Sequence, residues 1–120
     1  MNRRPWLVVM GTLLLGVAGA ATAQAVKLHK LTGAQIQGQV AGKRITDEGY
    51  WSMTLAARGK LMVRDMGHPS SGSWSIRNDQ LCIVRPGILS TCYDVWLRGD
   101  AVELRTPNAL PLTAWLRPAD

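Results

Sequence analysis

Residues 72–105 constrain the fold most strongly, because three turn signals there separate four runs of alternating apolar and polar residues. The signals are Asn78-Asp79, Pro86-Gly87 and Gly99-Asp100, and such dipeptides are typical of tight turns between strands. The stretch therefore predicts four consecutive antiparallel strands.

The hairpin registers agree with one another. Two-residue turns at the first and third signals, with Cys82 opposite Cys92 in the middle hairpin, define each pairing. They place nine apolar or aromatic side chains on one side of the sheet: Trp74, Ile76, Leu81, Ile83, Tyr93, Val95, Leu97, Val102 and Leu104. A slip of one residue in any hairpin would break this agreement. The middle loop is then expected to be Pro86-Gly87-Ile88.

Alternating segments also flank this meander. A short strand is expected over residues 43–46, and Trp51, Met53 and Leu55 alternate with polar residues as in a half-buried strand. A three-residue loop with Gly59 in the left-handed conformation would turn this strand into the next. Residues 66–73 have the composition of a loop, and the segment around Trp115 predicts a last strand.

One helix is predicted before the strands. Thr32 and Gln35 have the spacing of a capping box, which predicts a helix from about Gly33 to Ala41. Ile36 and Val40 lie four residues apart and would dock on the sheet. The fold class is therefore mainly β: an antiparallel up-and-down meander of seven or eight strands with one short N-terminal helix, forming a small sandwich or a partly closed barrel.

The first 23 residues have the pattern of a secretory signal peptide. Arg3 and Arg4 precede an apolar run, and Ala21-Thr22-Ala23 fits cleavage before Gln24. A retained anchor and twin-arginine export are the alternatives, but the apolar run is short for a membrane span. We expect residues 1–23 to be removed and residues 24–120 to form a single periplasmic or secreted domain without a stable membrane span.

An oxidising compartment gives the two cysteines a structural meaning. Cys82 and Cys92 lie on strands predicted to be neighbours, so a disulfide is expected. A redox-active pair is the alternative, although the short Cys-x-x-Cys spacing is absent. No histidine lies close enough in sequence to complete a four-ligand metal site, and no metal is expected.

The charge balance argues for an envelope partner rather than nucleic acid. Loss of Arg3 and Arg4 leaves 12 basic residues against 8 acidic ones. An exported protein with this excess would associate loosely with lipopolysaccharide, acidic glycans or anionic lipid. The alternative is that the basic residues are spread along solvated strand faces and turns. No glycine-rich phosphate loop, nucleophile elbow, haem-attachment motif or metal-ligand cluster is present, so neither enzymatic activity nor a cofactor is expected.

Short motifs in this order resemble those of small exported proteobacterial β-rich proteins of uncharacterised function. The motifs are Leu31-Thr32-Gly33 with Ile36, Gly42, Gly72 with Trp74, Leu81-Cys82 and Cys92-Tyr93. The resemblance implies a periplasmic β-rich domain and no catalytic residue. The Gly-x-Trp segment also resembles the one that opens lipocalin-type barrels, although here it lies mid-chain. This likeness implies a calycin-like shape for the barrel.

Two functions from different classes are predicted. The first is an interaction or structural domain that presents a sheet face to an envelope protein or glycan. Its patch lies opposite the core, and we expect Asp94 to face Arg105 there. The alternative is that the N-terminal helix or a terminal strand covers Trp96. The patch residues are Arg77, Asp94, Trp96, Arg98 and Arg105.

The second is a small-molecule-binding calycin-like barrel. Its ligand would contact large inward side chains, and a domain of this size leaves little room for a cavity. The expected lining residues are Trp51, Met53, Trp74 and Tyr93.

Overall fold

The computed structural model describes residues 27–119, so the predicted signal peptide lies outside the described residues. Most of the described chain is strand. In chain order the elements are β1 (His29–Lys30), α1 (Gly33–Gln39), β2 (Lys43–Thr46), β3 (Trp51–Leu55), η2 (Ala57–Gly59), β4 (Lys60–Asp65), β5 (His68–Arg77), β6 (Gln80–Arg85), β7 (Ile88–Arg98), β8 (Ala101–Arg105) and β9 (Leu112–Pro118).

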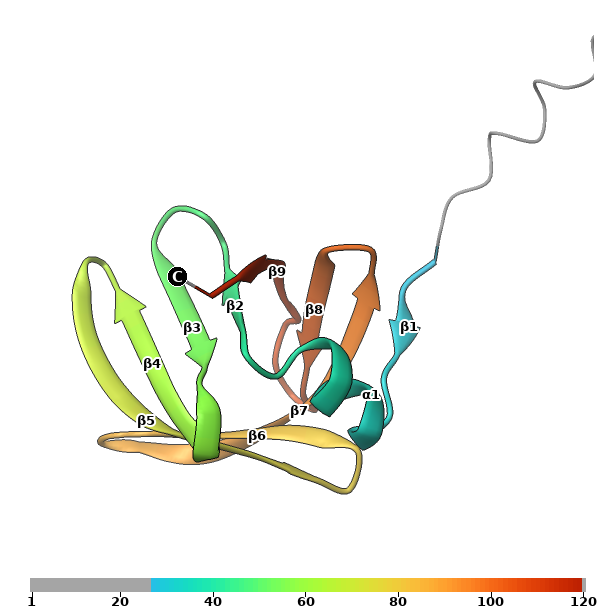
Figure 1. Cartoon of the computed structure of the whole chain (residues 1–120), viewed down its shortest axis with the longest axis horizontal. Helices are drawn as coiled ribbons and strands as arrows, with labels where there is room; N and C mark the ends of the chain where they lie inside the picture. The colour runs from blue at the N-terminus through green and yellow to red at the C-terminus, as the bar shows by residue number, and fades with distance from the viewer. Residues whose placement is uncertain (1–26, 120) are drawn as a thin grey trace, which may run out of the picture.

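Eight strands form a closed, calycin-like barrel. Each strand from β2 to β9 pairs antiparallel with the next, and β9 pairs with β2 to complete the ring (Figure 1). The two-residue β1 adds to the edge of β7, where Lys30 lies opposite Trp96. Of the two predicted shapes, the barrel is therefore the one formed, and its closure is complete.

The predicted registers are confirmed. Cys82 lies opposite Cys92, and the β5–β6 and β7–β8 hairpins have the expected two-residue turns. Asn78 and Asp79 both have positive φ, as a type I′ turn requires. The β3–β4 connection is also as predicted, with Gly59 at φ 74° and Ala56 N–H donating to Lys60 at 2.8 Å.

The loop predicted over residues 66–73 is wrong. A tight turn at Met66 and Gly67, with φ values of 51° and 83°, leads directly into β5 at His68. Pro69 suggested a loop, but it pairs with Arg64, next to the Asp65–His68 pair that closes the turn. At that position the strand nitrogen points away from β4, and β6 begins to pair with β5 only at Ser73. The missing N–H therefore costs no ladder hydrogen bond.

The middle loop is one residue shorter than predicted. Arg85 pairs with Ile88, so Pro86 and Gly87 alone form the turn. The register shifts by one between Ile83 and Arg85, which is a β-bulge. The bulge keeps the Cys82–Cys92 pairing while shortening the loop.

Helix α1 covers one end of the barrel. The capping box is confirmed, because the Thr32 hydroxyl accepts from Gln35 N–H and the Gln35 side chain accepts from Thr32 N–H. Ile36 and Val40 are fully buried. Gly33 N–H donates to the Asp79 carboxylate at 2.7 Å, which attaches the helix to the β5–β6 turn. The helix is two residues shorter than predicted.

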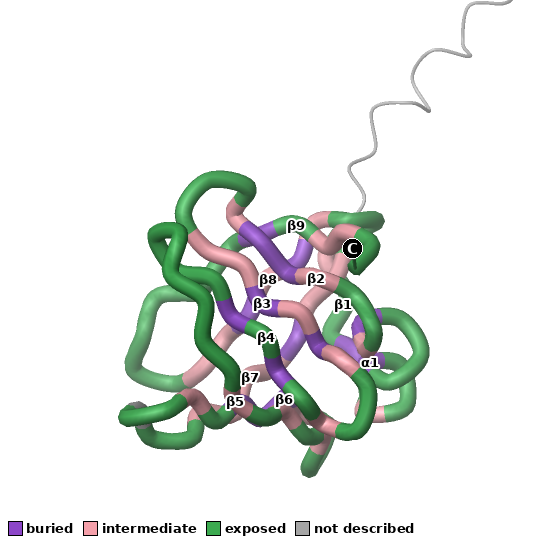
Figure 2. Tube along the Cα trace, turned by 60° about the vertical axis from the view of Figure 1, so that its left-hand side comes forward, coloured by how far each residue is buried: buried purple, intermediate pink, exposed green. Residues whose placement is uncertain are grey.

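The core fills the barrel next to the helix. Buried and exposed residues alternate along β4, as expected for a strand with one inward face (Figure 2). The core residues that are completely buried come from the helix and from most of the strands: Ile36, Val40, Ile45, Leu55, Leu61, Leu81, Val95 and Leu104. The Cys82–Cys92 disulfide joins β6 to β7 on the outer side of this core.

A glycine at position 72 allows β5 to cross β6 closely. A Cβ atom on Gly72 would overlap the Val84 carbonyl oxygen and lie 3.3 Å from the Arg85 Cα, which are backbone atoms that cannot rotate away. By contrast, a Cβ on Gly38 of the helix would meet no atom within 4 Å. A methyl group would therefore clash with the backbone of β6 at position 72, whereas it would meet open space at position 38.

We predict opposite effects of the same substitution at these positions. Gly72→Ala should lower the free energy of unfolding by about 2 kcal/mol or more, because the strands must separate. Gly38→Ala should raise it by about 0.5–1 kcal/mol, because alanine favours the helix. Urea unfolding of both variants is the test, and an unchanged stability for Gly72→Ala would contradict the close approach.

Candidate functional site

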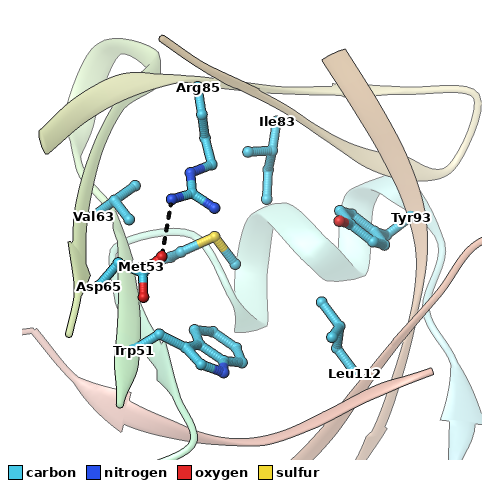
Figure 3. Close-up of a pocket in the computed structure, with 8 residues that line it drawn as sticks. All are labelled: Trp51, Met53, Val63, Asp65, Ile83, Arg85, Tyr93 and Leu112. Atoms are coloured by element: carbon cyan, nitrogen blue, oxygen red, sulfur yellow. Dashed lines mark hydrogen bonds and ion pairs between the residues drawn. The ribbon is translucent and has the colours of Figure 1, made fainter. Parts of the chain in front are cut away.

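A cavity of about 220 Å3 opens at the barrel end away from α1. Its walls are inward side chains of β3, β4, β6, β7 and β9, which surround a common space (Figure 3). The lining residues are Trp51, Met53, Val63, Asp65, Ile83, Arg85, Tyr93 and Leu112. This end of the barrel, which we call the mouth, is therefore hollow while the helix end is packed.

Strand alternation positions the lining residues. Trp51 and Met53 are two apart on β3, Val63 and Asp65 are two apart on β4, and each pair faces inward. Trp51 is the first residue of β3 and Asp65 the last of β4, so the two lie opposite each other at the mouth. The cavity is consequently built on strands rather than on loops.

The mouth contains one charged pair. Arg85 approaches Asp65 with a nitrogen-to-oxygen distance of 3.5 Å, drawn as the dashed line in Figure 3. The Arg85 Nε atom is buried and has no hydrogen-bond partner among residues 27–119. The other lining side chains are apolar or aromatic, so the cavity combines an apolar wall with one cationic group.

Asp47 fixes the hairpin that carries Trp51. Its Oδ1 atom accepts backbone N–H groups from Gly49, Tyr50 and Trp51 at 2.9, 2.8 and 3.0 Å. These hydrogen bonds, the one from Trp51 above all, lower the pKa of Asp47 below its ordinary value. The Asp47 carboxylate is therefore a positioning group for the aromatic wall of the cavity.

Exposed apolar side chains lie on the hairpins around the mouth. In an up-and-down barrel the β2–β3, β4–β5, β6–β7 and β8–β9 connections share one end. A large apolar or aromatic residue lies in or next to each connection with most of its surface in solvent: Tyr50, Met66, Leu110 and, in β7 just after its turn, Leu89. The entrance is therefore apolar as well as the interior.

Three of the four predicted ligand-lining residues lie on the cavity: Trp51, Met53 and Tyr93. Trp74 lies at the helix end instead, where its indole N–H donates to the Ala56 carbonyl at 2.8 Å. Sequence reasoning missed Asp65 and Arg85. Strand alternation from Val63 and Ile83 would have placed both inward, but charged strand-end residues are normally read as solvent-exposed.

The predicted interaction patch lies on the outer face, chiefly on β7 and β8. Asp94 lies opposite Arg105 and Trp96 opposite Glu103, as expected. The Arg105 guanidinium stacks over the Trp96 ring at 4.1 Å and also pairs with Glu103 at 2.6 Å. Trp96 is only partly exposed, and its indole N–H is buried without a partner among the described residues.

The remaining patch residues are Arg77, Arg98 and Asp94. Arg77 is exposed at the end of β5, two strands from β7, and Arg98 is exposed at the end of β7. Asp94 accepts from Gln80 at 3.1 Å and pairs with Lys30 at 3.7 Å. Trp96 and Arg105 are in contact, and Asp94 and Arg98 flank Trp96 on the same face of β7. Arg77, on β5, lies apart from this group.

Residues 27–119 contain neither a metal-binding cluster nor a membrane-spanning helix. Within that range no three His, Cys, Asp or Glu side chains are grouped so as to hold a metal ion. None of the helices described there is long and apolar enough to cross a membrane.

Comparisons with known proteins add no relative: no family model, curated protein or solved structure matches the chain. The geometry of the barrel is therefore the basis on which its function can be inferred.

The lowered pKa of Asp47 gives a prediction about acid stability. Its folded pKa lies below the unfolded value of about 3.9, so its charge stabilises the fold above that pH. This contribution is lost as the pH falls through the folded pKa. Asp47→Asn should therefore be less stable than the wild type at pH 7, with the difference shrinking towards pH 2.5. Urea unfolding across this range tests it, and a difference independent of pH would contradict the role of the charge.

Proposed function

We propose that the protein is a small-molecule-binding barrel that takes one compact, largely apolar ligand into the cavity at the mouth. The observation that carries the proposal is the cavity of about 220 Å3, enclosed by Trp51, Met53, Tyr93 and Leu112 within an otherwise packed barrel. Concave, mostly apolar spaces with a few polar groups are the usual form of small-ligand sites, and barrel mouths are a common place for them.

The size of the cavity limits the ligand. Sites for drug-sized ligands usually enclose about 300–1,000 Å3, and this cavity is smaller at about 220 Å3. A single aromatic ring with a short side chain, or a short acyl chain, matches the space. The aromatic faces of Trp51 and Tyr93 favour the ring, because aromatic groups stack on one another.

The proposal includes export from the cytoplasm. Two observations support it: the signal-peptide pattern of residues 1–23 and the Cys82–Cys92 disulfide, which persists in oxidising compartments. The ligand would then be a compound of the periplasm or the surroundings of the cell.

The sheet-face interaction domain is the second candidate. The contact between Trp96 and Arg105 supports it, since Trp and Arg are the usual residues of binding hot spots. It ranks second because Arg105 already covers the Trp96 ring, so a partner would have to displace that contact.

Blocking the mouth should abolish ligand binding. Leu112 lines the cavity and is partly exposed, so Leu112→Trp would project a larger side chain into the entrance. Leu110→Trp is the matched control, because Leu110 is 89% exposed and lies outside the cavity lining. With 3-phenylpropan-1-ol as the probe, we expect at least about tenfold weaker binding in Leu112→Trp only.

The binding can be followed through the Trp51 indole N–H resonance during an NMR titration. Unchanged melting temperatures would show that both variants are folded. Equal binding by both variants and the wild type, or a probe that leaves the Trp51 resonance unmoved, would contradict the proposal.

A further inference from the structure

We infer that the ligand of the mouth cavity carries a carboxylate and that the Arg85 guanidinium binds it; this inference rests on the proposed function. The ligand class is then a compact amphipathic organic acid, with its apolar body against Trp51 and Tyr93. The argument depends on three properties of Arg85: its direction, its unused donors and its charged neighbour.

Arg85 points into the cavity from the end of β6. It lies two residues after Ile83, which also lines the cavity, and Figure 3 shows its side chain extending between Ile83 and Asp65. Its Nε atom is buried without a hydrogen-bond partner in the described part of the chain. The Nε atom itself is enclosed by protein, so a ligand would meet the two terminal nitrogens of the guanidinium, which point toward the cavity in Figure 3.

The Asp65 carboxylate leaves most of the guanidinium unused. The Arg85–Asp65 distance is 3.5 Å, and the Asp65 side chain is 54% exposed. Charge-assisted hydrogen bonds are normally about 2.7–2.9 Å long, so this contact is loose. Arg117 shows the contrast within the same protein, because it binds Glu48 at 2.9 and 3.0 Å and Asp100 at 2.6 Å.

A carboxylate fits this environment better than a phosphate. An arginine guanidinium offers two parallel N–H donors that match the two oxygens of a carboxylate. The negative charge of Asp65 lies close by, so a dianionic group would be repelled more strongly than a singly charged one. The other lining residues offer no second cation, so Arg85 alone sets the position of the acid group.

The test compares 3-phenylpropanoate with 3-phenylpropan-1-ol, which share a ring and chain but differ in charge. Isothermal titration with the full-length protein should show the acid binding about tenfold more tightly than the alcohol, as expected for a charge-assisted hydrogen bond. Arg85→Met should remove this preference by weakening the acid alone. Arg64→Met is the matched control, since Arg64 precedes Asp65 but is exposed outside the cavity, and it should keep the preference.

A second variant keeps the inference testable if Arg85→Met is unstable. Asp65→Asn frees Arg85 from its competing carboxylate, so the acid should bind several-fold more tightly and the alcohol as before. Equal affinities of the two probes, or an acid preference that persists in Arg85→Met, would overturn the carboxylate inference and leave the cavity function standing. If neither probe binds or moves the Trp51 resonance, both proposals fail.

Discussion

The pairing of β2 with β9 joins the two ends of the meander, and the rest of the structure depends on it. Residues Lys43 to Thr46 pair in register with Trp115 to Pro118, which closes the ring of eight strands. Closure pairs the first strand of the meander with the last, so neither of these two strands is left as a free edge, and it gives every strand one inward and one outward face. The closed interior is then divided between a packed half and a hollow half.

The division of the interior follows from where the helix docks. Helix α1 places Ile36 and Val40 into one end of the barrel, next to Leu55, Leu61 and Leu81 of the core cluster. The other end receives no comparable plug from residues 27–119, and its side chains stop short of filling the space. A small domain has little stability to spare, so an unfilled apolar volume costs it packing energy. The lost packing energy is explained if the cavity binds a ligand.

The local structure of the meander could be predicted from the sequence alone. Turn dipeptides and alternation predicted the registers of the hairpins around Cys82 and Cys92, because each turn type allows only one register that buries the apolar set. The capping box likewise located the start of the helix at Gly33. Barrel closure was left open, since pairing between β2 and β9 joins strands about 70 residues apart and no local signal specifies it.

The candidate site was predictable only in part. Trp51, Met53 and Tyr93 follow from inward alternation and size, and all three line the cavity. Trp74 has the same pattern, but its strand end meets the helix rather than the mouth. Arg85 follows Ile83 by two residues and so faces inward by strand alternation as well. It was missed because a charged residue at a strand end is normally expected in solvent. The start of β5 was predicted as a loop because proline is uncommon inside strands. Pro69 is tolerated there because this part of β5 pairs with β4 alone.

Native mass spectrometry of the protein purified from the cells that make it tests the central claim, that the hollow mouth holds a small molecule, most directly. We expect a polypeptide carrying one compact molecule, which dissociates on unfolding and is identified as an organic acid. We expect Leu112→Trp purified in the same way to carry none. Wild-type protein that is recovered bare, or a molecule that is retained equally by Leu112→Trp, would show that the mouth is not a ligand site.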